Sequence, residues 1–227
     1  MGLVVLTGPS RGIGLATAQL LAGRGVELLL VGRASEALTR VEQQCRALGV
    51  RASAFPVDFL DRQAVRTLCA ALASLPEAPL ALINNAGVIH RAALEELTEE
   101  QWEEQLAVNL TVPSLLSRAV LPAMRRERRG RLVQVGSIAG TLGTARATAY
   151  CASKWGLIGF NKALAEELTD SGVSTVAVLP GSVDTDMLVG SGFQPRMTSA
   201  DVARTLVHYA LEAPIAHNGA VVEMFGV

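Results

Sequence analysis

The chain has 227 residues, of which 50% are hydrophobic, and its 20 lysines and arginines nearly balance its 21 aspartates and glutamates. This length and apolar content suit one α/β domain with a sizeable core, and the near-zero net charge gives no sign of nucleic acid or an anionic membrane as a partner. Cys45, Cys69 and Cys151 show no CxxC spacing, and the histidines are far apart in sequence, so we expect free thiols and no metal site.

The N-terminal sequence passes almost at once into the apolar run Leu3–Leu6, with no basic segment followed by a small-residue cleavage site. Apolar runs such as Leu28–Val31 and Leu80–Ile83 are far shorter than the roughly 20 residues needed to span a bilayer. We therefore expect a cytoplasmic protein with no membrane partner.

Short apolar runs alternate with segments of helical period along the whole chain. Continuous apolar character is typical of strands that are buried on both faces of a parallel sheet. The expected strands are Leu3–Leu6, Val26–Val31, Ala52–Pro56, Leu80–Ile83, Arg131–Val135, Ser174–Leu179 and Ala220–Met224. The expected helices are Leu15–Arg24, Ser35–Leu48, Asp61–Ala73, Thr98–Arg125, Ala149–Thr169 and Ser199–Leu211. This alternation predicts a single domain over residues 1–227 with the α/β Rossmann fold, a doubly wound, seven-stranded parallel sheet with helices on both faces.

Local signals mark several of these boundaries. Ser35 is typical of a helix N-cap, and Thr98 with Gln101 fits a capping box. The charged run Arg125–Arg131 falls between a helix and a strand, so we interpret it as a solvated turn rather than a binding patch.

A glycine-rich loop joins the first strand to the first helix. Gly8 permits a tight turn, Gly12 lets the backbone approach a pyrophosphate, and Gly14 lets helix and strand pack closely. The helix N-terminus offers free N–H groups to phosphates. In this context the loop predicts a dinucleotide site rather than a tight turn without a ligand. The loop residues expected to contact the dinucleotide are Gly8, Ser10, Arg11, Gly12, Ile13 and Gly14.

The end of the second strand indicates which dinucleotide is used. Gly32 occupies the position where NAD-using folds carry an acidic residue for the ribose 2′-hydroxyl. Arg33 follows, and its planar guanidinium suits a 2′-phosphate, with Arg11 as a second cation. The alternative is that both arginines are solvated surface charges. We predict NADP(H) as the cofactor.

Three side chains later in the chain carry candidate chemistry. Tyr150 and Lys154 are four residues apart at the start of a helix and share one face, and an ammonium is expected to lower the pKa of a neighbouring phenol. Ser137 follows the strand Arg131–Val135, at the sheet edge where α/β folds bind ligands. Asn109 lies in mid-helix, where asparagine has no propensity advantage, so a purely structural role explains it less well.

The glycine spacing and the Ser…Tyr-x-x-x-Lys pattern resemble the short-chain dehydrogenase/reductase family. The resemblance implies a catalytic tetrad in which Tyr150 protonates a carbonyl oxygen and Ser137 hydrogen-bonds to that oxygen. Lys154 would bind the nicotinamide ribose and depress the pKa of Tyr150, and Asn109 would fix a water that relays protons. The implied activity is hydride transfer between NADP(H) and a carbonyl or secondary alcohol.

Further motifs extend the resemblance over essentially the whole chain. Asn84–Gly87 resembles the family's NNAG motif, and Pro180–Thr185 resembles the segment that holds the nicotinamide carboxamide through Val183 and Thr185. Asp58 matches the acidic residue that meets the adenine, although a helix-capping carboxylate is the alternative. The resemblance thus adds to the cofactor site Asp58, Asn85, Ala86, Gly87, Tyr150, Lys154, Pro180, Gly181, Val183 and Thr185.

Two regions differ from the common pattern of the family. The C-terminal Val222–Val227 lacks the common Asp-Gly-Gly ending, and the loop near residues 186–198 is short where relatives carry a substrate lid. A short loop with Gly190, Gly192 and Pro195 predicts an open pocket and a broad substrate range, with an apolar lining from Met187, Leu188 and Phe193. No residue identifies the substrate.

The resemblance also bears on assembly and on alternative functions. Relatives commonly pair the helices equivalent to Thr98–Arg125 and Ala149–Thr169 across a two-fold axis, so a homodimer or homotetramer is expected. The alternative functions are a non-catalytic NADP(H)-binding redox sensor or scaffold, and a dehydratase or epimerase on the same scaffold. The retained Tyr150 and Lys154 favour a catalytic oxidoreductase acting on a small carbonyl or alcohol.

Overall fold

The computed structural model of the chain describes residues 2–226 and shows one sheet of seven parallel strands in the order β3-β2-β1-β4-β5-β6-β7. Chain order runs outward from β1 to β3, returns to β4 beside β1, and continues to β7, so the sheet is doubly wound as predicted. The strands are β1 Leu3–Thr7, β2 Glu27–Gly32, β3 Ala52–Pro56, β4 Ala81–Asn84, β5 Gly130–Val135, β6 Val173–Pro180 and β7 Ala220–Met224.

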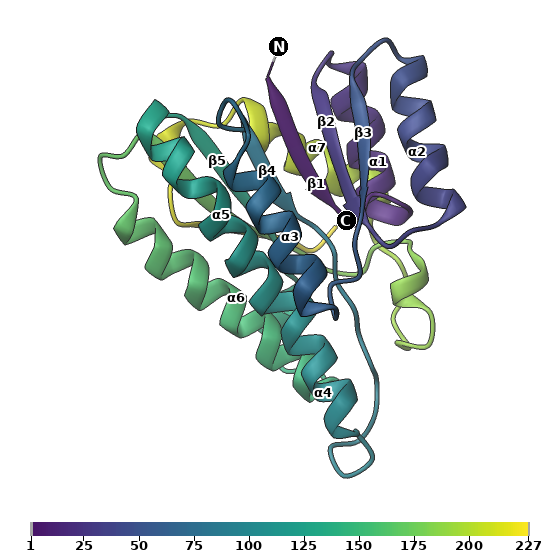
Figure 1. Cartoon of the computed structure of the whole chain (residues 1–227). Helices are drawn as coiled ribbons and strands as arrows, with labels where there is room; N and C mark the ends of the chain where they lie inside the picture. The colour runs from purple at the N-terminus through teal and green to yellow at the C-terminus, as the bar shows by residue number, and fades with distance from the viewer. Residues whose placement is uncertain (1, 227) are drawn as a thin grey trace.

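Helices cover both faces of the sheet (Figure 1). Helices α1, α2 and α7 pack on one face, and α3, α5 and α6 pack on the other. The α-helices are α1 Gly12–Gly23, α2 Glu36–Ala47, α3 Arg62–Ala73, α4 Glu99–Leu106, α5 Val112–Glu127, α6 Thr148–Glu167 and α7 Ser199–Leu211. Short helical turns are η1 Ala107–Thr111, η2 Ile138–Gly140, η3 Asp186–Leu188 and η4 Ile215–His217.

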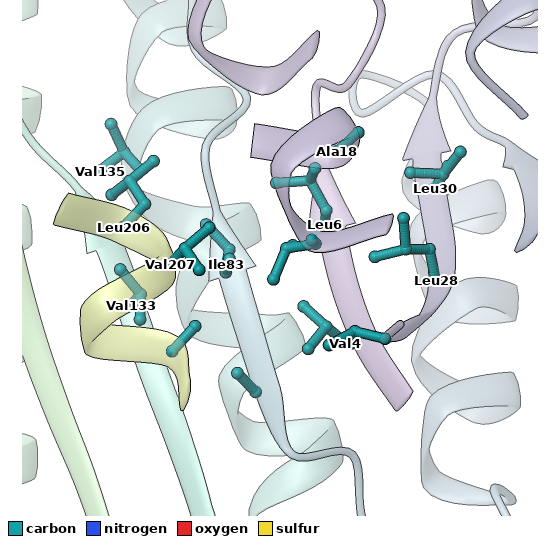
Figure 2. Packing of buried hydrophobic residues seen from close by; sticks show 14 of the residues in the cluster. Val4, Leu6, Ala18, Leu28, Leu30, Ile83, Val133, Val135, Leu206 and Val207 are labelled. Atoms are coloured by element: carbon teal, nitrogen blue, oxygen red, sulfur yellow. The ribbon is translucent and has the colours of Figure 1, made fainter. Parts of the chain in front are cut away.

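Alternate residues of the central strands supply the two cores. Val4 and Leu6 of β1 point toward α1 and α7, whereas Val5 belongs to the cluster on the opposite face. Figure 2 shows the first of these clusters, in which Leu6 lies beside Ala18 of α1 and Ile83 of β4 lies beside α7. Burial on both faces explains why the strands read as continuous apolar runs.

The predicted helix Thr98–Arg125 is wrong in one respect, because a π-helical turn, η1, separates α4 from α5. Pro113 has no N–H to bond the carbonyl of residue 109, four positions earlier, so the regular ladder is interrupted at this turn. Asn109 lies within η1, and π turns occur often at functional sites.

The stretch Glu99–Glu127 is long and apolar enough, by composition, to cross a membrane. Its apolar side chains have another explanation in the fold, because Leu116, Val120 and Met124 are buried against the sheet and its neighbouring helices. The apolar side chains of this stretch are therefore explained by its packing as a core helix.

Candidate active site

Four loops meet at the carboxyl ends of the central strands. Gly8 follows β1, Asn85 follows β4, Ser137 follows β5, and Gly181 follows β6. The chain reverses direction across the sheet between β1 and β4, and open α/β sheets bind ligands in the crevice at such a switch point. The predicted site residues are thus brought to one edge of the sheet.

The glycine loop has the geometry of a phosphate cradle. Gly8 and Gly12 adopt left-handed φ angles of 66° and 52°, and a Cβ on Gly14 would lie only 1.9 Å from the carbonyl oxygen of Gly8. Side chains larger than hydrogen are therefore excluded where the backbone must turn and approach a ligand. The N-terminus of α1 has no side-chain cap and no acidic residue in its first turn. Its N–H groups and positive dipole end therefore fit a pyrophosphate.

The NNAG segment holds this loop in place. The Asn85 amide donates to the carbonyl oxygens of Thr7 and Gly8, each at 3.0 Å. In return, the Thr7 hydroxyl accepts from the backbone N–H groups of Asn85 and Ala86, also at 3.0 Å. The loops after β1 and β4 therefore form one rigid unit. Sequence reasoning missed the role of Thr7, although its place directly before Gly8 was a usable signal.

Tyr150 and Lys154 lie together as their spacing predicts. Both side chains are buried, and the Lys154 Nζ lies 5.6 Å from the centre of the Tyr150 ring. Lys154 also donates to the carbonyl oxygen of Val135 at 2.8 Å. Burial lowers the pKa of Lys154 to about 8, so the ammonium form still predominates at neutral pH.

The pKa of Tyr150 departs from expectation. Burial raises it, while the hydroxyl of Ser137 and the charge of Arg91 act in the opposite direction. The Lys154 ammonium, which donates to the Val135 carbonyl oxygen, does not reverse the effect of burial on the pKa of Tyr150. The four-residue spacing predicts that the two groups are neighbours. It carries no information on burial, which has the largest effect on the pKa of the phenol.

Asn109 links Val88, the residue after the NNAG segment, to α6. Its side-chain oxygen accepts from the Val88 N–H at 2.9 Å, and its amide donates to the Val88 carbonyl oxygen at 2.9 Å and to the Ser153 hydroxyl at 3.1 Å. Ser153 in turn donates to the Tyr150 carbonyl oxygen at 2.7 Å. This network fixes the turn of α6 that carries Tyr150, and sequence reasoning gave no signal for Ser153.

The family model for short chain dehydrogenases matches residues 2–194. The chain belongs to this family. A 3-oxoacyl-[acyl-carrier-protein] reductase of Vibrio cholerae is 35% identical over 185 residues, covering 82% of this chain and 75% of the relative. The same reductase of Escherichia coli K12 is 33% identical over 186 residues, with the same two coverages.

A solved structure extends the likeness to the whole fold. A protein from Beutenbergia cavernae, assigned as an NAD(P) dependent gluconate 5-dehydrogenase, superposes with a TM-score of 0.90 at 30% identity. The match covers 98% of this chain and 94% of that one. The expected Rossmann fold and the expected hydride-transferring oxidoreductase are both confirmed.

The residues predicted to hold the adenosine end of the cofactor lie at the ends of β2 and β3. Arg33 is exposed directly after β2, and Gly32 pairs with Pro56 of β3, two residues before Asp58. One Asp58 carboxylate oxygen accepts from the Leu60 N–H at 3.0 Å, whereas Asp61 caps α3. The capping alternative for Asp58 is therefore wrong, and its contact with adenine stays a prediction.

The start of the loop 186–198 lies against the residues predicted to hold the nicotinamide end of the cofactor. A Cβ on Gly12 would lie 3.1 Å from Cγ2 of Thr185, which places the Pro180–Thr185 segment against the glycine loop. The Arg11 guanidinium lies 3.3 Å from the Asp186 carboxylate, and both side chains are exposed. Met187 Sδ lies 4.0 Å from the Tyr150 hydroxyl. The loop therefore contacts both the glycine loop and Tyr150. The sequence predicted a substrate loop here, but not its contact with the glycine loop.

Proposed function

We propose that this short-chain dehydrogenase transfers hydride between NADP(H) and a carbonyl or secondary alcohol, using Ser137, Tyr150 and Lys154. The observation that carries the proposal is the buried Tyr150–Lys154 pair at the sheet edge that also holds the uncapped glycine loop. The sensor or scaffold alternative finds no support among the relatives, whose names are those of a reductase and a dehydrogenase.

The chain's own residues supply proton handling and positioning. The cofactor, when bound, supplies the hydride. Because burial raises the pKa of Tyr150, its hydroxyl stays protonated at neutral pH and donates that proton to the carbonyl oxygen. Ser137 donates a hydrogen bond to the same oxygen and stabilises its developing charge. The charged Lys154 binds the nicotinamide ribose, and Asn109 is proposed to hold the water that returns protons.

NADP(H) rather than NAD(H) is the cofactor that the adenosine end fits. The buried Gly32 leaves no carboxylate at the ribose position, and Arg33 beside it is an exposed cation. The structural neighbour from Beutenbergia cavernae was solved with bound NADP at low occupancy, which supports the same choice for this chain. Gly8, Ser10, Gly12, Ile13 and Gly14 would hold the pyrophosphate end.

The substrate is tested by a panel, because the named relatives act on chemically different carbonyls. We expect loss of NADPH absorbance when the protein meets at least one member of a panel of ketones, aldehydes, diketones and 3-oxoacyl thioesters. A binding-only protein would retain NADPH with every compound. Such a result, with NADPH binding confirmed by fluorescence, would contradict the proposed activity.

We further propose that the protein is cytoplasmic and assembles as a homodimer or homotetramer through α5 and α6. A groove of about 300 Å³ between these helices is lined by Leu115, Leu121 and Phe160, among others, and Trp155 on α6 is 54% exposed. Apolar side chains left open on neighbouring helices favour a self-complementary interface. Light scattering at micromolar concentration is expected to give at least the dimer mass, and a monomer mass would refute the proposal.

A further inference from the structure

The loop that follows the NNAG segment runs beside the catalytic tyrosine. Ile89 packs against a small cluster formed by Ala139, Ala147 and Tyr150. Three residues further along, the Ala92 N–H donates to the Arg146 carbonyl oxygen at 3.0 Å, just ahead of α6. Because Arg91 lies between these two contacts, its backbone is held next to the Tyr150 end of α6.

A second anchor ties the same loop to α4. The His90 N–H donates to the Gln105 side-chain oxygen at 3.0 Å, and the His90 ring nitrogen Nε2 lies 2.8 Å from the Glu104 carboxylate. The residues on both sides of Arg91 are therefore hydrogen-bonded to fixed elements. The backbone of Arg91 is therefore fixed before a ligand binds, and only its side chain has to be ordered.

Arg91 differs from two other arginines near the site. Arg11 pairs with Asp186, and Arg146 pairs with Glu96. Arg91 is half-buried, yet within residues 2–226 no carboxylate lies within 4.0 Å of its guanidinium and no side-chain hydrogen bond involves it. A guanidinium partly withdrawn from water is unfavourable unless an anion or acceptor meets it.

The charge of Arg91 also reaches the reacting group. It lowers the pKa of the Tyr150 hydroxyl against the larger effect of burial. The proposed function places a substrate carbonyl at that hydroxyl, so a substrate bound there lies in the field of Arg91. A planar guanidinium binds a carboxylate through two parallel hydrogen bonds, which fixes orientation as well as charge.

We propose that Arg91 binds a carboxylate carried by the substrate, so that the enzyme favours compact keto acids and their hydroxy acids over neutral ketones and alcohols. This inference rests on the proposed function and names the substrate class of the same site. Arg91 would determine specificity, while Tyr150 and Ser137 handle the carbonyl oxygen.

The test compares keto acids with their neutral esters. Acetoacetate, 4-oxopentanoate and 5-oxohexanoate place the carboxylate at increasing distances from the ketone, and each methyl ester removes the charge with little change in shape. For at least one pair we expect the wild-type kcat/KM with NADPH to favour the acid by about 10- to 100-fold, the usual effect of a charged hydrogen-bonded pair. Arg91→Met should bring this ratio close to one, and Arg91→Lys should retain part of it.

Arg146→Met is the matched control, because Arg146 lies beside the same loop but is exposed and already paired with Glu96. It should keep the wild-type ratio. A second readout is the rise in melting temperature that each acid or ester gives to the protein with NADP⁺. We expect the acid to stabilise the wild type more than its ester does, and this difference to vanish in Arg91→Met.

The outcomes separate this inference from the proposed function. Reduction of esters and acids with equal efficiency and equal stabilisation would overturn the role of Arg91 and leave the oxidoreductase activity standing. If no ketone were reduced while the acids still stabilised the wild type but not Arg91→Met, the proposed activity would fail and the carboxylate site would stand. An Arg91→Met variant that kept the wild-type acid-to-ester ratio would also overturn the proposed role of Arg91.

Discussion

Tyr150→Phe is expected to lower turnover by about 10²-fold or more while leaving NADPH binding nearly intact, because a positioned acid typically contributes that factor. The substitution removes only the hydroxyl and keeps the ring in its cluster with Ala139 and Ala147. The main contact of Lys154 is the Val135 carbonyl oxygen, so the ammonium keeps its position without the phenol oxygen. Steady-state NADPH oxidation and NADPH fluorescence titration measure the two effects separately.

The chain offers a matched control in its other tyrosine. Tyr209 on α7 packs its ring edge-on to His208, far along the chain from Tyr150 and Lys154. Tyr209→Phe makes the same chemical change and should leave turnover within about two-fold, as for an ordinary substitution outside a functional site. A wild-type rate in Tyr150→Phe would show that another group supplies the proton.

Much of this site could be predicted from the sequence, because its chemistry depends on local spacing. Gly8, Gly12 and Gly14 had to be close to a strand end and a helix start, and parallel strands place their carboxyl ends at one edge. Tyr150 and Lys154 had to share a helix face. One boundary differs from the prediction: α1 begins at Gly12 rather than Leu15, because the Leu15 N–H donates to the Arg11 carbonyl oxygen at 3.2 Å and closes the first helical turn within the glycine loop.

The features that escaped prediction all depend on contacts between segments distant in sequence. The raised pKa of Tyr150 comes from burial by several elements, which no four-residue pattern records. The ion pair between Arg11 and Asp186 joins two loops that are 175 residues apart in the sequence. Arg91 stands out only through tertiary contacts, because Arg146 pairs with Glu96 whereas Arg91 makes no ion pair within residues 2–226.

Arg33→Asp is expected to reverse or abolish a strong preference for NADPH. Arg33 and Arg11 are the two cations proposed to meet the 2′-phosphate, and charge-assisted contacts of roughly 1.5–3 kcal/mol each would give on the order of 10²–10⁴-fold preference over NADH. Arg11 is partnered by Asp186 in the structure, but both side chains are about three-quarters exposed. Such a surface pair contributes only about 0–1 kcal/mol, so a phosphate competes with it readily.

Arg33 has no such competitor, since it is exposed beside the buried Gly32 and within residues 2–226 makes no ion pair. The aspartate would repel the 2′-phosphate and could accept from the 2′-hydroxyl of NADH, as acidic residues at this point do in NAD-using folds. The apparent KM for NADPH should therefore rise sharply, with NADH use equal or improved. Arg40→Asp on the exposed part of α2 makes the same change in net charge and should leave the preference intact. The prediction is contradicted if the wild type has equal kcat/KM with NADPH and NADH. It is also contradicted if the Arg33→Asp variant still prefers NADPH, because another group would then bind the 2′-phosphate.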